Sequence, residues 1–431
     1  MSKFRFLLLF CLSFFSITAN ANFVFNENCI KAYKNILSLK FNEGALQLAQ
    51  EKKTNPNNKI PVLLENYIDF LKVLTTENNA SFENFKSNKS ARISIIEDDD
   101  KRSPWYLYAA AEINLQSCIN RFKYLEFVSG AYELQKAYKL LEENQKKFPD
   151  FLPNKKSFAL LYGLIGLVPE QYKWALSSIG LKGNTEQGAA MLEDLTQKLP
   201  KSNYAYFYDE SAFFLSFIYL SKEGDPAIYD KVKLVCDAVP KTNLLGVYVK
   251  ALAASKTGHT DDAIEILMER PKTPNYGAFY HLDYLLGLCK LNRFDNDAVI
   301  YFESYLKNYT GNFNIKDAYL KIAWFYLLRG NIDKYNAYIA LCKIRGKAIS
   351  EKDKDAQNLC LQIYPPDIAL LKARLYFDGG YYDKAVFALK DKKASSFSLT
   401  KEKLEYFYRM GRICHQQNKT DQAIVFYTAT I

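Results

Sequence analysis

One pattern recurs at near-constant intervals in the second half of the chain and constrains its fold more than any other feature. In the clearest copy, Asp367 to Leu389, small residues stand at Ala373 and Ala385, with Gly380 and Tyr382 between them. An alanine lets a neighbouring helix approach closely, and a glycine can adopt the left-handed conformation that ends a helix. The stretch therefore predicts two short helices joined by a tight turn.

The same offsets recur in three further copies. Their marker residues are Ala251, Gly258, Ala263 and Leu267; Ala323, Gly330, Tyr335 and Ile339; and Gly411, Asn418, Ala423 and Tyr427. A degenerate copy of the pattern, with a shorter turn, lies between the first two, from Leu286 to Phe302. The interval from Ala251 to Ala323 is 72 residues, or two units of 36, whereas Ala323 to Ala373 spans 50. The excess of 14 (50 minus 36) places an insertion in the polar run 346–358.

This order of small, glycine, aromatic, small and large residues resembles the tetratricopeptide repeat, a helix-turn-helix unit of about 34 residues. Four copies in register favour such repeats over unrelated amphipathic hairpins. The resemblance implies an all-α, right-handed α-solenoid of about ten helical hairpins. It divides the chain into a less regular helical-repeat region over residues 22–200 and C-terminal repeats over residues 201–431.

Residues 158–195 depart from the regular spacing. Their glycines and proline are Gly163, Gly166, Pro169, Gly180, Gly183 and Gly188. The segment resembles the signature of the eukaryotic inclusion-body-clearance family of tetratricopeptide proteins, with Leu181 in place of Phe and Asn184 in place of Asp. From the residues alone, Gly163 and Gly166 permit a close helix crossing, and Asn184 or Thr185 caps the following helix. A phosphate-binding loop is not favoured, because neither its motif nor a preceding strand is present.

Residues 1–21 have the features of a secretory signal peptide. Lys3 and Arg5 precede an apolar run, and Ala19-Asn20-Ala21 is a small-x-small cleavage site. The run is too short to span a bilayer comfortably, and no other long apolar stretch follows. We therefore expect an exported chain without a transmembrane span, located in the periplasm or cell envelope, with secretion as the alternative.

Composition and motifs argue against several classes of function. The net charge is +10, but the basic residues are spread along the chain and form no stripe with interleaved aromatics, so nucleic acid is not an expected partner. The three histidines form no His-Glu-x-x-His motif, and neither a Cys-x-x-Cys pair nor a Gly-x-Ser-x-Gly elbow occurs. We expect no catalytic residues, no metal ligands and no cofactor.

Seven cysteines remain after the expected cleavage: Cys29, Cys118, Cys236, Cys289, Cys342, Cys360 and Cys414. Most lie on the apolar faces of predicted helices, where buried free thiols are the ordinary interpretation. An oxidising compartment also permits one or two disulfides. Cys342 and Cys360 flank the insertion and are the candidate pair.

The resemblance also implies a binding groove, since the first helix of each tetratricopeptide hairpin lines the concave face. The corresponding positions select six candidate site residues: Tyr248, Trp324, Arg374, Phe377, Tyr408 and Arg412. Leu252, Leu320, Leu327, Leu370 and His415 share these offsets. Arg374 and Arg412, in consecutive repeats, can together hold a carboxylate. The alternative is that the aromatics pack between repeats and the arginines are solvated.

Taken together, these features predict a non-catalytic scaffold that binds protein partners in the cell envelope. The alternative is an envelope protein that captures glycans or peptides on aromatic side chains. A scaffold predicts a large apolar or mixed groove. A glycan-binding protein predicts exposed aromatics flanked by Asp and Asn on one rim.

Overall fold

The computed structural model describes residues 22–98, 101–166, 168, 174, 176–177, 180–181, 183–222 and 225–430. Within these ranges the chain forms 21 α-helices and three short 3-10 helices, with no strand, so the expected all-α class is confirmed. None of the helices described is long and apolar enough to cross a membrane. The expected signal peptide lies outside the described residues, as does Pro169, where the sequence predicts the end of a helix.

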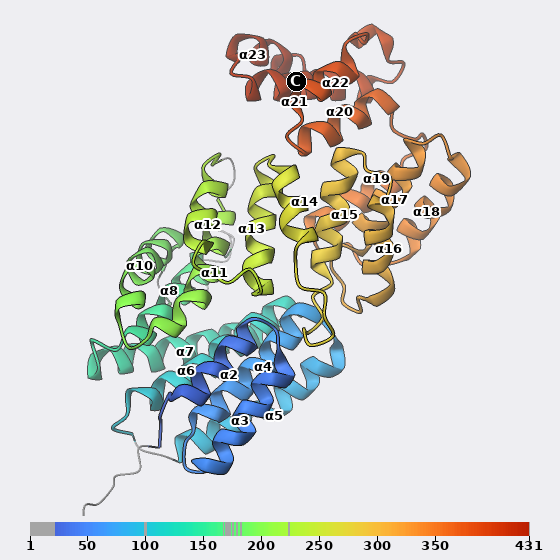
Figure 1. Cartoon of the computed structure of the whole chain (residues 1–431). Helices are drawn as coiled ribbons and strands as arrows, with labels where there is room; N and C mark the ends of the chain where they lie inside the picture. The colour runs from blue at the N-terminus through green and yellow to red at the C-terminus, as the bar shows by residue number, and fades with distance from the viewer. Residues whose placement is uncertain are drawn as a thin grey trace, which may run out of the picture.

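Three helical hairpins form the N-terminal end of the molecule (Figure 1). They are α2 (Glu27–Leu37) with α3 (Phe41–Thr54), α4 (Ile60–Thr76) with α5 (Asn79–Glu97), and α6 (Pro104–Lys123) with α7 (Phe127–Lys147). Local signals set their starts: the side chains of Asn26, Asn78 and Ser103 each accept a hydrogen bond from a backbone amide in the first turn. The first helices, α2, α4 and α6, also pack side by side.

The next four helices are α8 (Leu152–Gly166), α10 (Thr185–Lys198), α11 (Tyr208–Leu220) and α12 (Ile228–Cys236), with 3-10 turns η1 (Leu199–Lys201) and η2 (Ala205–Phe207) between α10 and α11. The backbones of α8 and α10 are in contact. A Cβ atom on Gly188 would lie 2.7 Å from Ala159 O and 2.9 Å from Gly163 N. The expected close crossing at Gly163 is therefore confirmed. Asn184 caps α10, accepting a hydrogen bond from Gln187 N at 2.7 Å.

The C-terminal part contains α13 (Leu244–Lys256), α14 (Thr260–Met268), α15 (His281–Arg293), α16 (Ala298–Asn308), α17 (Ile315–Leu327), α18 (Ile332–Ile344), α19 (Glu351–Cys360), α20 (Ile368–Asp378), α21 (Tyr382–Leu389), η3 (Ala394–Ser396), α22 (Thr400–Gln416) and α23 (Thr420–Thr428). The expected left-handed turns are present. Gly258, Gly330, Gly380 and Asn418 have φ angles of 82°, 72°, 79° and 60°. The insertion is not merely a loop, because it contains α19, a single helix between two hairpins.

A cluster of buried charges joins five helices in the N-terminal core. Lys156 on α8 lies between two glutamates, with its Nζ 3.2 Å from Glu112 Oε1 and 2.7 Å from Glu210 Oε2. It also donates to Tyr67 at 3.1 Å, and Tyr33 donates to Glu210. Burial lowers the pKa of Lys156, but the two carboxylates outweigh burial and raise it above its ordinary value. The cluster fixes α2, α4, α6, α8 and α11 around one charged group.

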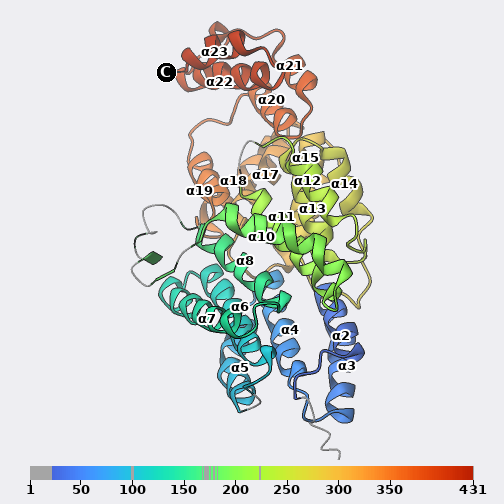
Figure 2. The ribbon, with the colours of Figure 1, turned by 90° about the vertical axis from the view of Figure 1, so that its left-hand side faces the viewer.

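Three hydrophobic clusters follow one another along the chain. The first extends from Phe23 to Cys289, the second from Tyr284 to Leu375, and the third is confined to α20–α22 and their connections. In Figures 1 and 2, α20–α23 (red) lie above the yellow helices, at the opposite end from α2–α5. After α19 the chain returns, so that α20 packs against α15. This return encloses the candidate site.

Candidate binding cavity

A cavity of about 710 Å³ lies between two groups of helices. Residues of α13, α15, α17 and the start of α12 line one side, and residues of α20 and α22 line the other. Helix α19 adds a further wall with Lys352, Asp355 and Leu359. Leu285 and Leu288 of α15 add apolar surface. The cavity therefore depends on the return of the chain after α19.

Two glycine turns meet where the cavity closes. A Cβ atom on Gly380, between α20 and α21, would lie 1.9 Å from Gly258 O, between α13 and α14. Both glycines have left-handed φ angles, 79° and 82°. Beside them, Tyr381 donates a hydrogen bond to Asp261 at 3.0 Å. A side chain larger than hydrogen at position 380 thus collides with backbone, which cannot move aside cheaply.

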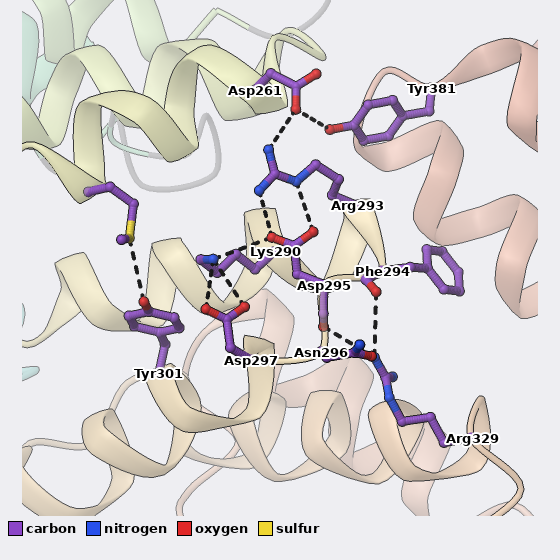
Figure 3. Close-up of polar contacts among 11 residues, drawn as sticks. Asp261, Lys290, Arg293, Phe294, Asp295, Asn296, Asp297, Tyr301, Arg329 and Tyr381 are labelled. Carbon is purple, nitrogen blue, oxygen red and sulfur yellow. Dashed lines mark hydrogen bonds and ion pairs between the residues drawn. The ribbon is translucent and has the colours of Figure 1, made fainter.

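Charged side chains extend this contact toward α15 and are drawn in Figure 3. Arg293 lies 2.6 Å from Asp295 and 3.0 Å from Asp261, which also accepts from Tyr381. The hydrogen bonds from Arg293 hold the pKa of Asp295 below its usual range. We call the set Gly258, Asp261, Arg293, Gly380 and Tyr381 the closing contact. It fixes the end of the cavity with paired charges and touching backbones.

The turn between α15 and α16 is held by two more cations in the same view (Figure 3). Lys290 lies 2.8 Å from Asp297 and 3.3 Å from Asp295. Arg329, two residues after α17, donates to Asn296 Oδ1 at 3.0 Å and to Asp295 O at 3.2 Å. The turn that carries Asp295, the partner of Arg293, is therefore held by Lys290 of α15 and by Arg329, which follows α17. Both helices also line the cavity.

More basic than acidic side chains line the cavity. The six basic residues are Lys222, Lys256, Lys321, Lys352, Arg374 and Arg412, and the four acidic residues are Asp225, Asp317, Asp355 and Asp378. The lining thus carries an excess of two positive charges when all of these groups are ionised. Such an excess in a concave site attracts anionic groups.

The two arginines selected from the sequence meet at one carboxylate. Arg374 Nε lies 3.9 Å from Asp378 Oδ2, and Arg412 Nη1 lies 3.5 Å from Asp378 Oδ1. Each guanidinium also lies over an aromatic ring, Arg412 at 4.1 Å from the Phe377 centroid and Arg374 at 4.9 Å from that of Trp324. Both distances to Asp378 are longer than those of a close ion pair, so the arginines keep capacity for a second acceptor.

Lys321 adds a cation that is crowded by its neighbours. Its Nζ lies 3.2 Å from Asp317 Oδ1 and 4.0 Å from the centroid of Trp324. Burial lowers the pKa of Lys321, and the positive charges of Arg374 and Lys352 lower it further against the attraction of Asp317. An anionic group that enters beside these cations relieves their mutual repulsion.

The structure brings together only some of the six residues selected from the sequence. Arg374, Phe377 and Arg412 line the cavity. Trp324 lines an adjoining pocket of about 200 Å³, to which Arg374 also contributes. Tyr408 lies 5.7 Å from the Arg412 guanidinium but does not line the cavity. Tyr248 lies away from it, packed against Phe279 with centroids 4.9 Å apart.

Sequence reasoning missed Lys321 and Lys352. Lys352 belongs to α19, which the repeat offsets do not cover. Lys321 directly follows Leu320, an offset position that does line the cavity, as do Leu252 and His415. Long side chains next to an offset position were therefore the available signal for Lys321, and no comparable signal existed for Lys352.

Comparison with known proteins adds no family. No protein-family model matches the chain, and a search of the curated proteins finds no match. Within the described ranges, no group of three or more His, Cys, Asp or Glu side chains is placed to hold a metal ion. The functional argument therefore depends on the cavity itself.

Proposed function

We propose that the chain is an exported, non-catalytic scaffold of the tetratricopeptide type, a right-handed α-solenoid of about ten helical hairpins. The proposed ligand is a segment of a partner protein, held in the cavity between α13–α19 and α20–α22. The observation that carries the proposal is the position of Arg374 and Arg412, on successive first helices, which line one side of this cavity together. The repeat spacing and the four left-handed turns support the same class.

The chemistry of the cavity favours a segment with a carboxylate. Arginine can bind a carboxylate with two parallel hydrogen bonds, and the two guanidinium groups lie over the rings of Phe377 and Trp324. Apolar surface from Leu252, Leu285 and Leu288 suits the hydrophobic side chains of the same segment. A mixed cavity of this kind fits the scaffold expectation.

The glycan-binding alternative requires aromatic faces that are free to stack against sugars. Lys321 and Arg374 lie over Trp324, and Arg412 lies over Phe377. These cations occupy the aromatic surface that a glycan would use. We therefore favour a protein segment over a glycan.

The test is an affinity pull-down of the mature protein from the envelope fraction of its own cells. The double variant Arg374→Glu/Arg412→Glu is compared with the wild type. A control double variant, Lys146→Glu/Lys241→Glu, makes the same charge change at side chains that are 75% and 89% exposed. We expect one protein to co-purify with the wild type and the control, and to be lost with the cavity variant. A partner retained by all three proteins contradicts the cavity assignment, and the absence of any partner contradicts the scaffold.

A further inference from the structure

Two thiols meet in the core beside the cavity wall. Cys342, near the end of α18, and Cys360, the last residue of α19, are both fully buried in the hydrophobic cluster shared by α17, α18 and α19. The two side chains are close enough that Cys360 raises the pKa of the Cys342 thiol. Cys342 Sγ also lies 3.7 Å from Ala356 O, one helical turn before Cys360. The packing of α19 on α18 thus places the two cysteines side by side in one buried cluster.

The remaining described cysteines have no such neighbour. They lie on five different helices and are Cys29, Cys118, Cys236, Cys289 and Cys414. Their recorded polar neighbours are amide, hydroxyl or charged groups rather than thiols; Cys29, for example, contacts Asn58, and Cys236 contacts Ser216. Among the described thiols, the meeting of Cys342 and Cys360 is therefore specific.

We propose that Cys342 and Cys360 form a disulfide that ties α19 to α18 when the chain folds in an oxidising compartment. The two cysteines are 18 positions apart (360 minus 342), and the segment between them contains α19. A cross-link over a segment of this length restricts the unfolded chain and so favours the folded state.

The oxidant is a disulfide, supplied by a thiol–disulfide oxidoreductase or by oxidised glutathione. The thiolate of one cysteine attacks a sulfur of this disulfide, which forms a mixed disulfide and releases one thiolate. The second cysteine, after losing its proton, attacks the protein sulfur of the mixed disulfide and displaces the other thiolate. Both leaving thiolates take up protons, so two protein thiols are oxidised while one disulfide is reduced to two thiols.

This exchange belongs to folding rather than to the folded protein. Burial raises the pKa of Cys342, and the neighbouring Cys360 raises it further. The reactive thiolate is therefore scarce after α19 has packed, and both sulfur atoms are out of reach of an oxidant. A chain that folds reduced is expected to stay reduced until it unfolds locally.

The disulfide also completes the support of the cavity wall. At the start of α19, Asp353 accepts hydrogen bonds from Asn314 N at 2.7 Å and Lys316 N at 3.0 Å, which fix this end to α17. The Cys342–Cys360 bond fixes the other end to α18. Lys352 is next to Asp353 in the chain, and Leu359 is next to Cys360. The two anchors therefore hold both residues in the cavity wall. This consequence for binding rests on the proposed function, whereas formation of the bond does not.

The test is refolding followed by peptide mapping. The full mature chain is reduced, unfolded, refolded in a glutathione redox buffer, alkylated and digested with trypsin. We expect the peptides 335–343 and 355–372, which contain Cys342 and Cys360, to appear as one linked species that separates on reduction. Because no partner is present in this assay, its outcome is independent of the proposed function.

Two variants complete the test. Cys342→Ala is expected to lose the link and Cys414→Ala to keep it. If Cys342→Ala does not fold, comparison of alkylated peptides from wild type and Cys414→Ala still decides the question. Alkylation of both Cys342 and Cys360 in fully refolded wild type, or a link from either of them to a different cysteine, overturns the proposal.

Discussion

At the scale of single residues, burial determines the charge of His281, the first residue of α15. Its Nε2 lies 3.6 Å from Glu77 Oε1, a distance at which a protonated histidine would be stabilised. However, Glu77 already lies 2.8 Å from Lys123 Nζ. Burial, with a smaller contribution from the charges of Lys123 and Lys352, lowers the pKa of His281 to about 3. The side chain is therefore neutral at physiological pH.

This neutrality predicts a loss of stability in mild acid. The unfolded chain binds a proton at His281 near its ordinary pKa of about 6.5, whereas the folded protein does so only near 3. Between these values the unfolded state holds more protons, so stability falls as pH falls below about 6.5. At pH 5 the expected cost is about 2 kcal/mol, from about 1.5 pKa units at 1.36 kcal/mol each. Urea unfolding at pH 7.5 and pH 5 measures it.

Two variants separate His281 from other groups that titrate in this range. His281→Gln is expected to reduce the difference between the two pH values by most of this amount. His259→Gln, at an exposed position between α13 and α14, should leave the difference as in wild type. Equal pH dependence in wild type and His281→Gln would contradict the assignment.

At the scale of helices, the close contact between α8 and α10 requires that residue 188 have no side chain. Gly188→Leu places a side chain where Ala159 O and Gly163 N lie within 3 Å of the new Cβ atom. Backbone atoms cannot rotate away, so we expect a loss of roughly 3 kcal/mol, at the upper end for overpacking. Thermal unfolding followed by circular dichroism measures the loss. Ala190→Leu, on the exposed face of the same helix, is the control and should change stability little. Equal midpoints for the two variants would show that the helices separate freely.

The helices and turns differ in how well they could be predicted from the sequence. The turns at Gly258, Gly330 and Gly380 were predictable because a left-handed residue is a local requirement of the chain. Helix α19 was not, because its buried positions include a polar side chain, Asp353, whose partners are backbone amides of α17. Its apolar pattern is correspondingly weak. Local signals thus identify hairpins, but not how an inserted helix packs.

The candidate site likewise has residues that could be predicted from the sequence and residues that could not. Arg374 and Arg412 follow from repeat offsets, because those offsets state which face of a first helix is turned inward. The contribution of Lys352 depends on α19, and the meeting of Gly258 with Gly380 joins residues 122 positions apart (380 minus 258). Neither depends on a local pattern. The cavity is a consequence of long-range packing, which a single sequence does not reveal.

At the scale of the whole molecule, the closing contact holds the helices on one side of the cavity, α20–α22, against those on the other. The third hydrophobic cluster belongs to α20–α22, and an exposed segment, residues 361–365, precedes them. Stacking of Phe294 on Tyr376, with centroids 4.3 Å apart, and the closing contact join this cluster to α13–α15. Loss of the closing contact should therefore loosen α20–α23 without unfolding them.

Gly380→Ala tests this idea, and Gly330→Ala is its matched control. Both glycines have left-handed φ angles, 79° and 72°, so alanine adds about 1 kcal/mol of backbone strain at either position. Only at Gly380 does the new Cβ atom also collide with Gly258 O, since nothing lies within 4 Å of Gly330. We therefore expect the amides of residues 254–262, in the opposite turn, to exchange hydrogen faster in Gly380→Ala than in wild type. Hydrogen exchange measured by mass spectrometry gives this readout more than 100 positions from the substitution.

Unchanged exchange at residues 254–262 in Gly380→Ala, or the same increase in Gly330→Ala, would mean that the two turns do not hold one another. An increase confined to Gly380→Ala instead identifies the closing contact as the structural element that keeps Arg374 and Arg412 opposite α13 and α15, and partner binding should weaken in that variant alone.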